Sequence, residues 1–143
     1  MNHEASLQQV IRFFEHIAPD SVGQLAQIYA EDARFKDPFN EVTGIAPITK
    51  IFRHMFAQVN APRFVVTNSV LQGDQAFLTW DFLFRMKRFS REEQCIRGAT
   101  HIRFDASGRV ALHRDYWDAA EELYEKLPVL GSLMRGLKSL ANR

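Results

Sequence analysis

The stretch that decides the fold is IYAEDARFKDPF, residues 28–39, which is followed by Gly44 and a helical apolar pattern. Its second half, residues 33–39, is predicted as a short extended segment. Gly44 indicates a turn, and Pro47 stands where the first turn of a helix tolerates proline. The helix predicted after this turn has six apolar residues on one face: Ile48, Ile51, Phe52, Met55, Phe56 and Val59.

Two further helices are predicted before this stretch. The first has apolar residues at helical spacing from Leu7 and ends at residues 19–20, Pro-Asp. Ser21 and Gln24 form a capping-box pattern, in which each side chain satisfies a backbone N–H at a helix start. The second helix is therefore expected to begin there and to run to about Ala30.

After the third helix the apolar period changes from helical to two. Turn residues at 73–74 and 107–108 separate the extended runs, so the sequence predicts a meander of long antiparallel strands. One face of the second strand is apolar and consists of Leu78, Trp80, Phe82, Phe84 and Met86. Three helices before such a sheet predict an α+β fold in which the helices cover only one of its sides.

Residues 28–39, with Gly44 and the third helix, resemble the Tyr-Ala-Asp-Asp-Ala-x-x-x-Asp-Pro-Phe segment of ketosteroid isomerases. Residues 102–110, IRFDASGRV, and the pair at 116–117 are similar to the closing hairpin and last strand of the same nuclear transport factor 2-like superfamily. That superfamily also holds the SnoaL-like polyketide cyclases. The resemblance covers about residues 7–118. It implies a cone-shaped, cystatin-like fold around an apolar pocket, and usually a homodimer formed through the outer face of the sheet.

Asp37 matches the general base that the resemblance implies, which in the isomerases moves a proton between two carbons of a bound substrate. Such a base needs a carboxylate made more basic by desolvation, and flanking Phe35 and Phe39 would supply apolar surroundings. The alternative is that Asp37 and Pro38 only begin a turn, which Asp before Pro favours. Both interpretations of Asp37 stay open on the sequence.

The isomerases also use two donors for the enolate oxygen, a tyrosine and a protonated aspartic acid. Counting along the matched segments puts Phe13 and Thr100 at these positions. Phe13 has no donor, and a threonine hydroxyl donates a weaker hydrogen bond than a carboxylic acid. The sequence therefore argues against steroid isomerisation by the family mechanism.

His113, Asp115 and Trp117 share one face of the last predicted strand, and the resemblance points that face into the pocket. A histidine and a carboxylate near Asp37 would suit acid–base catalysis. SnoaL-like cyclases are similar in placing polar acid–base residues on late strands. The alternative is a solvated pair at a dimer surface, because a bulge would reverse which face points inward.

The expected pocket collects side chains from several elements. Its predicted members are Phe13, Tyr29, Phe35, Phe39, Trp80, Phe82, Thr100 and Trp117. The alternative for the apolar residues of the second strand is that they are plain core. Packing of the second helix on the sheet would explain Tyr29 equally well.

Composition narrows the classes of partner. The 143 residues suit one domain, and 46% of them are hydrophobic, which is enough for a single core. A net charge of +1 provides no field to gather polyanions, so no nucleic-acid partner is expected. One cysteine and a polar start without a signal-peptide layout predict a cytoplasmic protein. No metal-ligand motif or phosphate loop is present in the sequence, so neither a metal nor a cofactor is predicted.

Residues 1–126 are predicted to form the domain, and residues 127–143 an amphipathic helical tail that is part of it or a lid. The tail has an apolar stripe of Leu130, Leu133, Met134, Leu137 and Leu140. Its charges in that stretch are all basic, which would also permit peripheral contact with an anionic membrane. Closure of the cone or cover of the partner subunit is the favoured role.

Two classes of function follow. The first is a proton-transfer enzyme, an isomerase, cyclase or dehydratase, for a small apolar carbonyl compound, with Asp37 as base and His113 or Asp115 assisting. The second is a non-catalytic module that binds a small apolar ligand or a protein. Retention of Asp37 favours the first class, and loss of the oxyanion donors favours the second.

Overall fold

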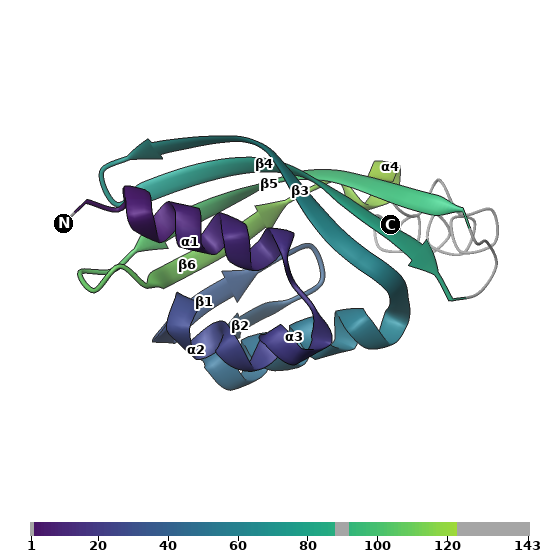
Figure 1. Cartoon of the computed structure of the whole chain (residues 1–143), viewed down its shortest axis with the longest axis horizontal. Helices are drawn as coiled ribbons and strands as arrows, with labels where there is room; N and C mark the ends of the chain where they lie inside the picture. The colour runs from purple at the N-terminus through teal and green to yellow at the C-terminus, as the bar shows by residue number, and fades with distance from the viewer. Residues whose placement is uncertain (1, 88–91, 123–143) are drawn as a thin grey trace, which may run out of the picture.

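The computed structural model describes residues 2–87 and 92–122, which form a layer of helices against one curved sheet (Figure 1). The helical elements are α1 (Glu4–Glu15), the 3-10 helix η1 (Pro19–Gln24), α2 (Leu25–Ile28), α3 (Ile45–Gln58) and α4 (Ala119–Glu122). The strands are β1 (Tyr29–Lys36), β2 (Glu41–Thr43), β3 (Val59–Gln72), β4 (Gln75–Met86), β5 (Glu93–Phe104) and β6 (Val110–Tyr116). The predicted α+β class is confirmed.

The sheet has the strand order β2-β1-β6-β5-β4-β3. Strands β3 to β6 form the expected antiparallel meander, whereas β1 pairs with β6 in parallel. The sheet is therefore mixed rather than wholly antiparallel, because the last strand of the meander returns beside the first strand of the chain. This parallel pair aligns Phe35 with His113 and has a register shift between Tyr29 and Arg34.

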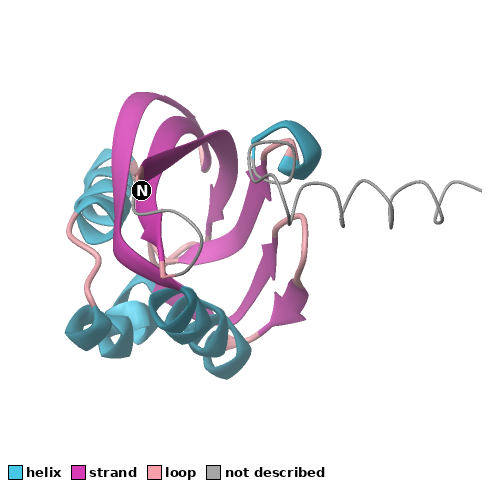
Figure 2. Cartoon of the chain, turned by 90° about the vertical axis from the view of Figure 1, so that its right-hand side faces the viewer, coloured by secondary structure: helices cyan, strands magenta, loops and turns pink. Residues whose placement is uncertain are grey.

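The long strands β3, β4 and β5 bend, and the sheet curls into an open cone with α1, α2 and α3 on its concave side (Figure 2). Helix α1 packs against β3, and α3 packs against β1 and β3. Strands β2 and β3 are the two edges, so the sheet does not close into a barrel. The face opposite the helices is called the outer face below.

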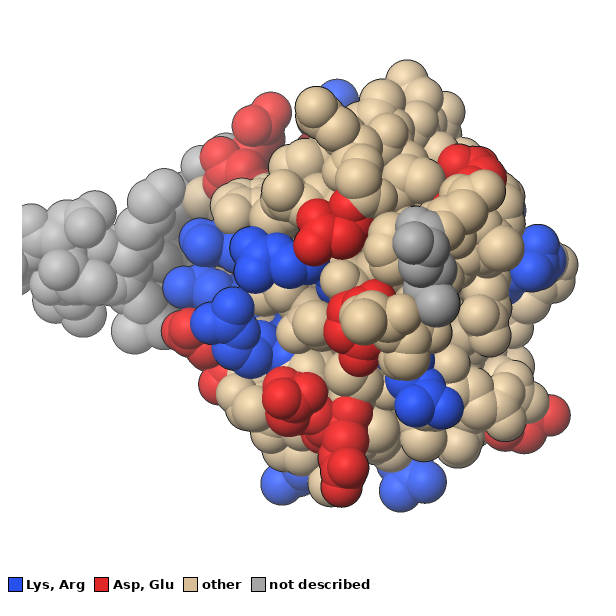
Figure 3. Space-filling view, turned by 90° about the vertical axis from the view of Figure 1, so that its left-hand side faces the viewer, with Lys and Arg blue, Asp and Glu red and all other residues tan. Residues whose placement is uncertain are grey.

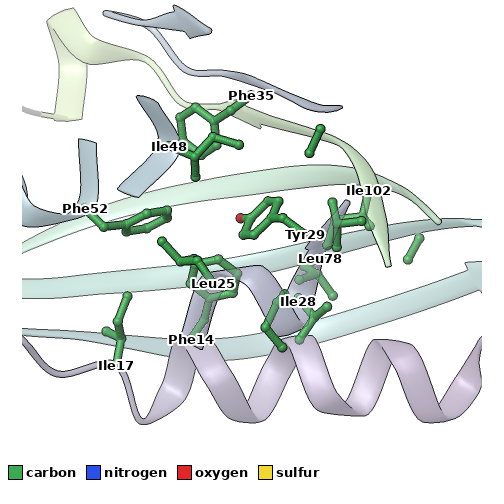
Figure 4. Packing of buried hydrophobic residues seen from close by; sticks show 14 of the residues in the cluster. Phe14, Ile17, Leu25, Ile28, Tyr29, Phe35, Ile48, Phe52, Leu78 and Ile102 are labelled. Atoms are coloured by element: carbon green, nitrogen blue, oxygen red, sulfur yellow. The ribbon is translucent and has the colours of Figure 1, made fainter. Parts of the chain in front are cut away.

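The hydrophobic core fills the space between these helices and the concave face. Its largest fully buried side chains are Tyr29, Leu7, Leu25, Ile48, Ile102, Val22 and Val110. Figure 4 shows rings from different elements, including Phe14, Phe52 and Phe35, gathered over the sheet. Burial of each such side chain stabilises the fold by about 1.5–3 kcal/mol.

The second helix differs from the prediction. Ser21 does not cap it; its Oγ accepts the Ala18 N–H and donates to the Ala18 carbonyl, both at 2.9 Å, at the start of η1, where Ala18 is the N-cap. Helix α2 ends at Ile28, and Tyr29 and Ala30 belong to β1. The physical reason is sheet pairing: Tyr29 aligns with Val110 of β6, which satisfies the backbone and buries the ring.

The third helix follows the prediction. Gly44 precedes it with a φ of 104°, donates its N–H to the Ala33 carbonyl at 2.8 Å and accepts the Ile48 N–H at 3.3 Å. Pro47 lies in the first turn, as expected. The predicted tail and its boundary after residue 126 lie outside the described residues.

Charged side chains of both signs cover the described surface. Figure 3 shows one end of the molecule, where several Lys and Arg side chains gather beside groups of Asp and Glu, and other basic side chains lie apart from them. This end therefore carries no extended field of one sign. None of the helices in the described ranges is long and apolar enough to span a membrane.

Candidate functional site

A recess enters the core between α1, α3 and the concave face of the sheet. It has about 400 Å³ including the part open to solvent, and about 30 Å³ of this admits the centre of a water-sized sphere. The lining residues are Phe14, Phe52, Phe64, Val66, Leu78, Trp80, Thr100, Ile102, His113 and Asp115. Thr100, His113 and Asp115 thus stand together in otherwise apolar surroundings.

These polar side chains belong to one continuous hydrogen-bond chain that crosses four strands. Trp80 Nε1–H donates to Thr100 Oγ1 at 2.7 Å, and the Thr100 hydroxyl donates to Asp115 Oδ1 at 2.6 Å. His113 Nε2 lies 2.7 Å from the same Asp115 oxygen. The Tyr29 hydroxyl lies 2.6 Å from His113 Nδ1.

One assignment of hydrogens satisfies all of these contacts. Ionised Asp115 accepts from Thr100 and from the Nε2–H of neutral His113, whose Nδ1 then accepts the Tyr29 O–H. Burial, and secondarily the charge of Asp115, raises the pKa of Tyr29 well above its ordinary value. The tyrosine therefore keeps the proton that it donates, and the chain converges on one oxygen of Asp115.

The second carboxylate oxygen is available to a ligand. The side chains of His113 and Asp115 both line the recess and are 5% and 18% exposed, so the carboxylate is the more accessible of the two. Within residues 2–87 and 92–122 no hydrogen bond reaches Asp115 Oδ2. A partly buried carboxylate with one free oxygen is a proton acceptor by its chemistry.

Sheet register explains why these residues meet. Thr100 on β5 aligns directly with Asp115 on β6, so their side chains lie on the same face at contact distance. Alternation along β6 puts His113 on that face as well. Phe35 lies against the imidazole with ring centroids 4.7 Å apart, and Phe14 meets it edge-on at 5.6 Å. Packing thus fixes the ring that holds Asp115.

Asp37 has a different environment, at a turn after β1. Its Oδ1 accepts the backbone N–H groups of Phe39 at 2.8 Å and Asn40 at 2.7 Å. The Asn40 side-chain amide also lies 3.1 Å from Oδ1 and 3.2 Å from Oδ2. Asp37 is not among the residues that line the recess. This is the geometry of a turn-forming aspartate, and its role as a base stays a prediction.

The other predicted site residues fall into two groups. Trp80 and Thr100 line the recess, and Tyr29 and Phe35 lie buried behind it around His113.

The second group does not line the recess. Phe13 is half-buried beside Phe14, and half-buried Phe82 stacks on Phe64 with centroids 4.6 Å apart. Phe39 is 54% exposed and meets half-buried Trp117 edge-on at 5.5 Å.

Sequence reasoning missed several lining residues: Phe14, Phe52, Phe64, Val66, Leu78 and Ile102. A signal existed for Phe14, which shares the buried face of α1 with Leu7 and Val10. Counting along the family segment selected Phe13 instead, which points about 100° away around the helix. As for metals, the described part of the chain groups no three His, Cys, Asp or Glu side chains as candidate ligands.

Comparison with solved structures shows the same fold elsewhere. A putative SnoaL-like polyketide cyclase from Shewanella putrefaciens is similar with a TM-score of 0.73 and 17% identity, over 87% of this chain and 97% of that chain. An LEH-like epoxide hydrolase from M. tuberculosis is similar with a TM-score of 0.68 and 14% identity, over 97% of this chain and 94% of that chain.

A hypothetical protein from Catenulispora acidiphila, with a ketosteroid isomerase-like fold and in complex with trimethylamine, is a third similar structure. Its TM-score is 0.70 at 16% identity, over 84% of this chain and 90% of that chain. No curated protein sequence matches this chain significantly. The family model for the SnoaL-like domain matches residues 10–113. The chain therefore belongs to the SnoaL-like domain family, with the nuclear transport factor 2-like and ketosteroid isomerase-like fold.

Proposed function

We propose that this protein is a proton-transfer enzyme, an isomerase, cyclase or dehydratase, that acts on a small, largely apolar carbonyl compound. The Asp115–His113 pair is its acid–base group. The observation that carries the proposal is Asp115 in the lining of an apolar recess, with Oδ1 held by Thr100 and His113 and with no hydrogen bond from the described residues to Oδ2. Base chemistry also suits a family that includes polyketide cyclases.

The donor groups of the site narrow the reaction. The Trp80 indole, the Thr100 hydroxyl and the Tyr29 hydroxyl already donate within the chain. No other donor among the described lining residues is left for an enolate oxygen, apart from a protonated Asp115. We therefore propose a substrate that delocalises its own negative charge, such as one with a C–H bond between two carbonyl groups.

In the proposed reaction Asp115 Oδ2 takes the proton from the substrate carbon, and the C–H electron pair moves into the conjugated system of the substrate. The same carboxyl group then returns the proton, to another carbon in an isomerisation, to the new alkoxide in a ring closure or to a departing hydroxyl in a dehydration. His113 and Thr100 hold Oδ1 throughout, so the carboxylate does not rotate away. Tyr29 in turn keeps the imidazole in the tautomer with Nε2–H.

The lining of the recess supports an apolar substrate. Phe52, Phe64 and Ile102 offer apolar contact beside the carboxylate. Each Å² of apolar surface buried there contributes about 25 cal/mol to binding.

Nitrobenzisoxazole is a suitable probe, because removal of its C–H proton opens the ring to a coloured phenolate without help from a donor. We expect saturable elimination with the wild type and about a 100-fold lower rate for Asp115→Asn. Asp37→Asn is the matched control and is expected to keep the wild-type rate. Loss of activity in Asp37→Asn but not in Asp115→Asn would return the base to the position that the family resemblance implies.

Non-catalytic binding is the second candidate, and it is favoured by the fact that the donors of the site are engaged with one another. The same variants separate the two functions. If the probe binds equally to the wild type and Asp115→Asn, as measured by calorimetry, and neither opens the ring, the recess is a binding site only.

We also propose that two copies pair through the outer face of the sheet. Large apolar side chains are exposed there, with Val65 37%, Phe77 50% and Tyr116 49% exposed, and Phe77 stacks on His101 at 4.6 Å. Native mass spectrometry is expected to give a dimer for the wild type and a monomer for Phe77→Glu. Phe39→Glu, at the turn after β1, is the control that keeps the dimer. A wild type that is monomeric at micromolar concentration contradicts this proposal.

A further inference from the structure

Gly98 lies on the concave face of β5, directly opposite Trp80 of β4. A Cβ atom placed on Gly98 would be 2.4 Å from Cη2, 2.5 Å from Cζ2 and 2.9 Å from Cζ3 of Trp80. Carbon atoms that are not bonded to each other approach to about 3.5–4.0 Å. The six-membered part of the indole therefore lies against a position that only glycine leaves empty.

Side-chain space, rather than backbone conformation, is what requires glycine here. Gly44, Gly73 and Gly108 have positive φ angles, and Gly98 does not. Glycine inside a strand weakens the strand and often marks a close approach of another group. At Gly98 the approaching group is the indole of Trp80.

The indole crosses Gly98 to reach the acid–base site. Trp80 is 7% exposed and packs edge-on against Phe64 with centroids 5.6 Å apart. Its Nε1–H donates to Oγ1 of Thr100, two residues beyond Gly98 on the same face of β5. An indole displaced from Gly98 would lose both the packing and this hydrogen bond.

The hydrogen bond from Trp80 directs the Thr100 hydroxyl. An indole N–H only donates, so Thr100 Oγ1 accepts from it and points its own hydrogen to Asp115 Oδ1. Without that donor the Thr100 oxygen loses one of its two hydrogen bonds among the described contacts, and only the bond that the hydroxyl donates to Asp115 still holds the side chain. Thr100 would then be less firmly positioned against Asp115 Oδ1, which leaves His113 as the more firmly placed partner of that oxygen.

We propose that Gly98 is a positioning residue of the acid–base site, because it gives Trp80 the space from which the indole orients Thr100 toward Asp115. This inference rests on the proposed function for its effect on the rate. Its structural half, the link from Gly98 through the indole to Thr100, is independent of any reaction. Two measurements therefore test it separately.

The first measurement follows the probe elimination in a double-mutant cycle. Gly98→Ala and Trp80→Phe each remove the indole–Thr100 hydrogen bond, so each is expected to lower the rate about tenfold. The double variant is expected to be no slower than Trp80→Phe, because both changes remove the same contact. Its stability is expected to exceed that of Gly98→Ala, since the smaller phenyl ring leaves room for the new methyl group. If the double variant regained the wild-type rate together with its stability, Gly98 would have only a packing role and the proposal would be overturned.

The second measurement is the NMR signal of the Trp80 indole N–H, with the Trp117 indole as an internal reference. In the wild type the Trp80 N–H is expected at low field and in slow exchange with water, because it is buried and hydrogen-bonded at 2.7 Å. Gly98→Ala is expected to move it upfield and to speed its exchange. Gly23→Ala is the control, since no atom lies within 4 Å of a Cβ at that position.

The outcomes of the two measurements distinguish failure of this inference from failure of the proposed function. An unchanged indole signal in Gly98→Ala would overturn the inference whatever the rates are. If the wild type does not open the probe but the indole signal moves as expected, the proposed function fails while the link from Gly98 to Thr100 stands. If Gly23→Ala moved the Trp80 indole signal by the same amount, the effect would not be specific to Gly98, and this result would also overturn the inference.

Discussion

Removal of the Tyr29 hydroxyl tests the hydrogen-bond chain at its most buried point. Tyr29 is 1% exposed, and its hydroxyl lies 2.6 Å from His113 Nδ1. The change Tyr29→Phe keeps the ring and removes one O–H, so it leaves a buried nitrogen without a partner. We expect the free energy of unfolding at neutral pH to fall by about 1–3 kcal/mol.

The pH dependence of this loss follows from the tyrosine itself. Burial, and then the charge of Asp115, raises the pKa of Tyr29 well above its ordinary value of 10.0. Below that ordinary value both the folded and the unfolded chain hold the proton, so the contribution of the hydroxyl is fully present. Above it the unfolded chain releases the proton and the folded chain retains it, so the wild type loses stability by up to about 1.4 kcal/mol per pH unit.

The assay is urea unfolding of both proteins at neutral pH and at about pH 11, one unit above the ordinary tyrosine pKa. The stability difference between the wild type and Tyr29→Phe is expected to narrow by about 1 kcal/mol at the higher pH. Tyr116→Phe is the matched control, because Tyr116 is 49% exposed, and it is expected to follow the wild type at both pH values. A difference that stays constant or widens at high pH would refute the assignment of the Tyr29 proton.

Three further predictions concern other positions. Asp37→Ala is expected to lower the free energy of unfolding by about 1 kcal/mol in urea, because two backbone N–H groups lose their acceptor, and to leave the probe rate unchanged. Gly44→Ala is expected to cost about 1–3 kcal/mol in the same assay, because its φ of 104° suits only glycine, and a cost no larger than that of Gly23→Ala would contradict this. Thr100→Val is expected to slow the probe reaction about tenfold, whereas Thr100→Ser keeps the hydroxyl and the rate; equal rates for both would show that the hydroxyl is not used.

Local patterns predicted the helices and strands in which apolar residues recur at one constant period over many residues. Helix α3 and strands β3 to β5 have many apolar residues at one period, and their boundaries follow the turns at Gly44 and Gly73. Helix α2 was predicted too long, because the partner of Tyr29 is Val110, far away in the sequence. A sequence pattern that spans about ten residues cannot reveal a pairing between residues so far apart.

Residues of the site were predictable only from strand alternation or from the segments that resemble ketosteroid isomerases. Alternation alone put His113 and Asp115 on one face, and counting along the matched hairpin selected Thr100 as the position of the isomerases' aspartic acid. Its alignment with Asp115 is visible only in the structure. The contact of Tyr29 with His113 depends on a parallel strand pair that no local pattern encodes. The turn at Asp37 was one of two interpretations; the hydrogen bonds of its carboxylate show the turn, and its role as a base stays a prediction.

The parallel pairing of β1 with β6 also has a consequence for the order in which the protein forms. Strand β1 is synthesised early and β6 is among the last parts of the described chain. Tyr29 therefore cannot contact His113 until the strands between them have been made. Contacts of such long sequence separation are slow to close. A nascent or truncated chain that lacks β6 also lacks His113 and Asp115, so the hydrogen-bond chain to which we assign the acid–base chemistry forms only when the whole sheet has been made.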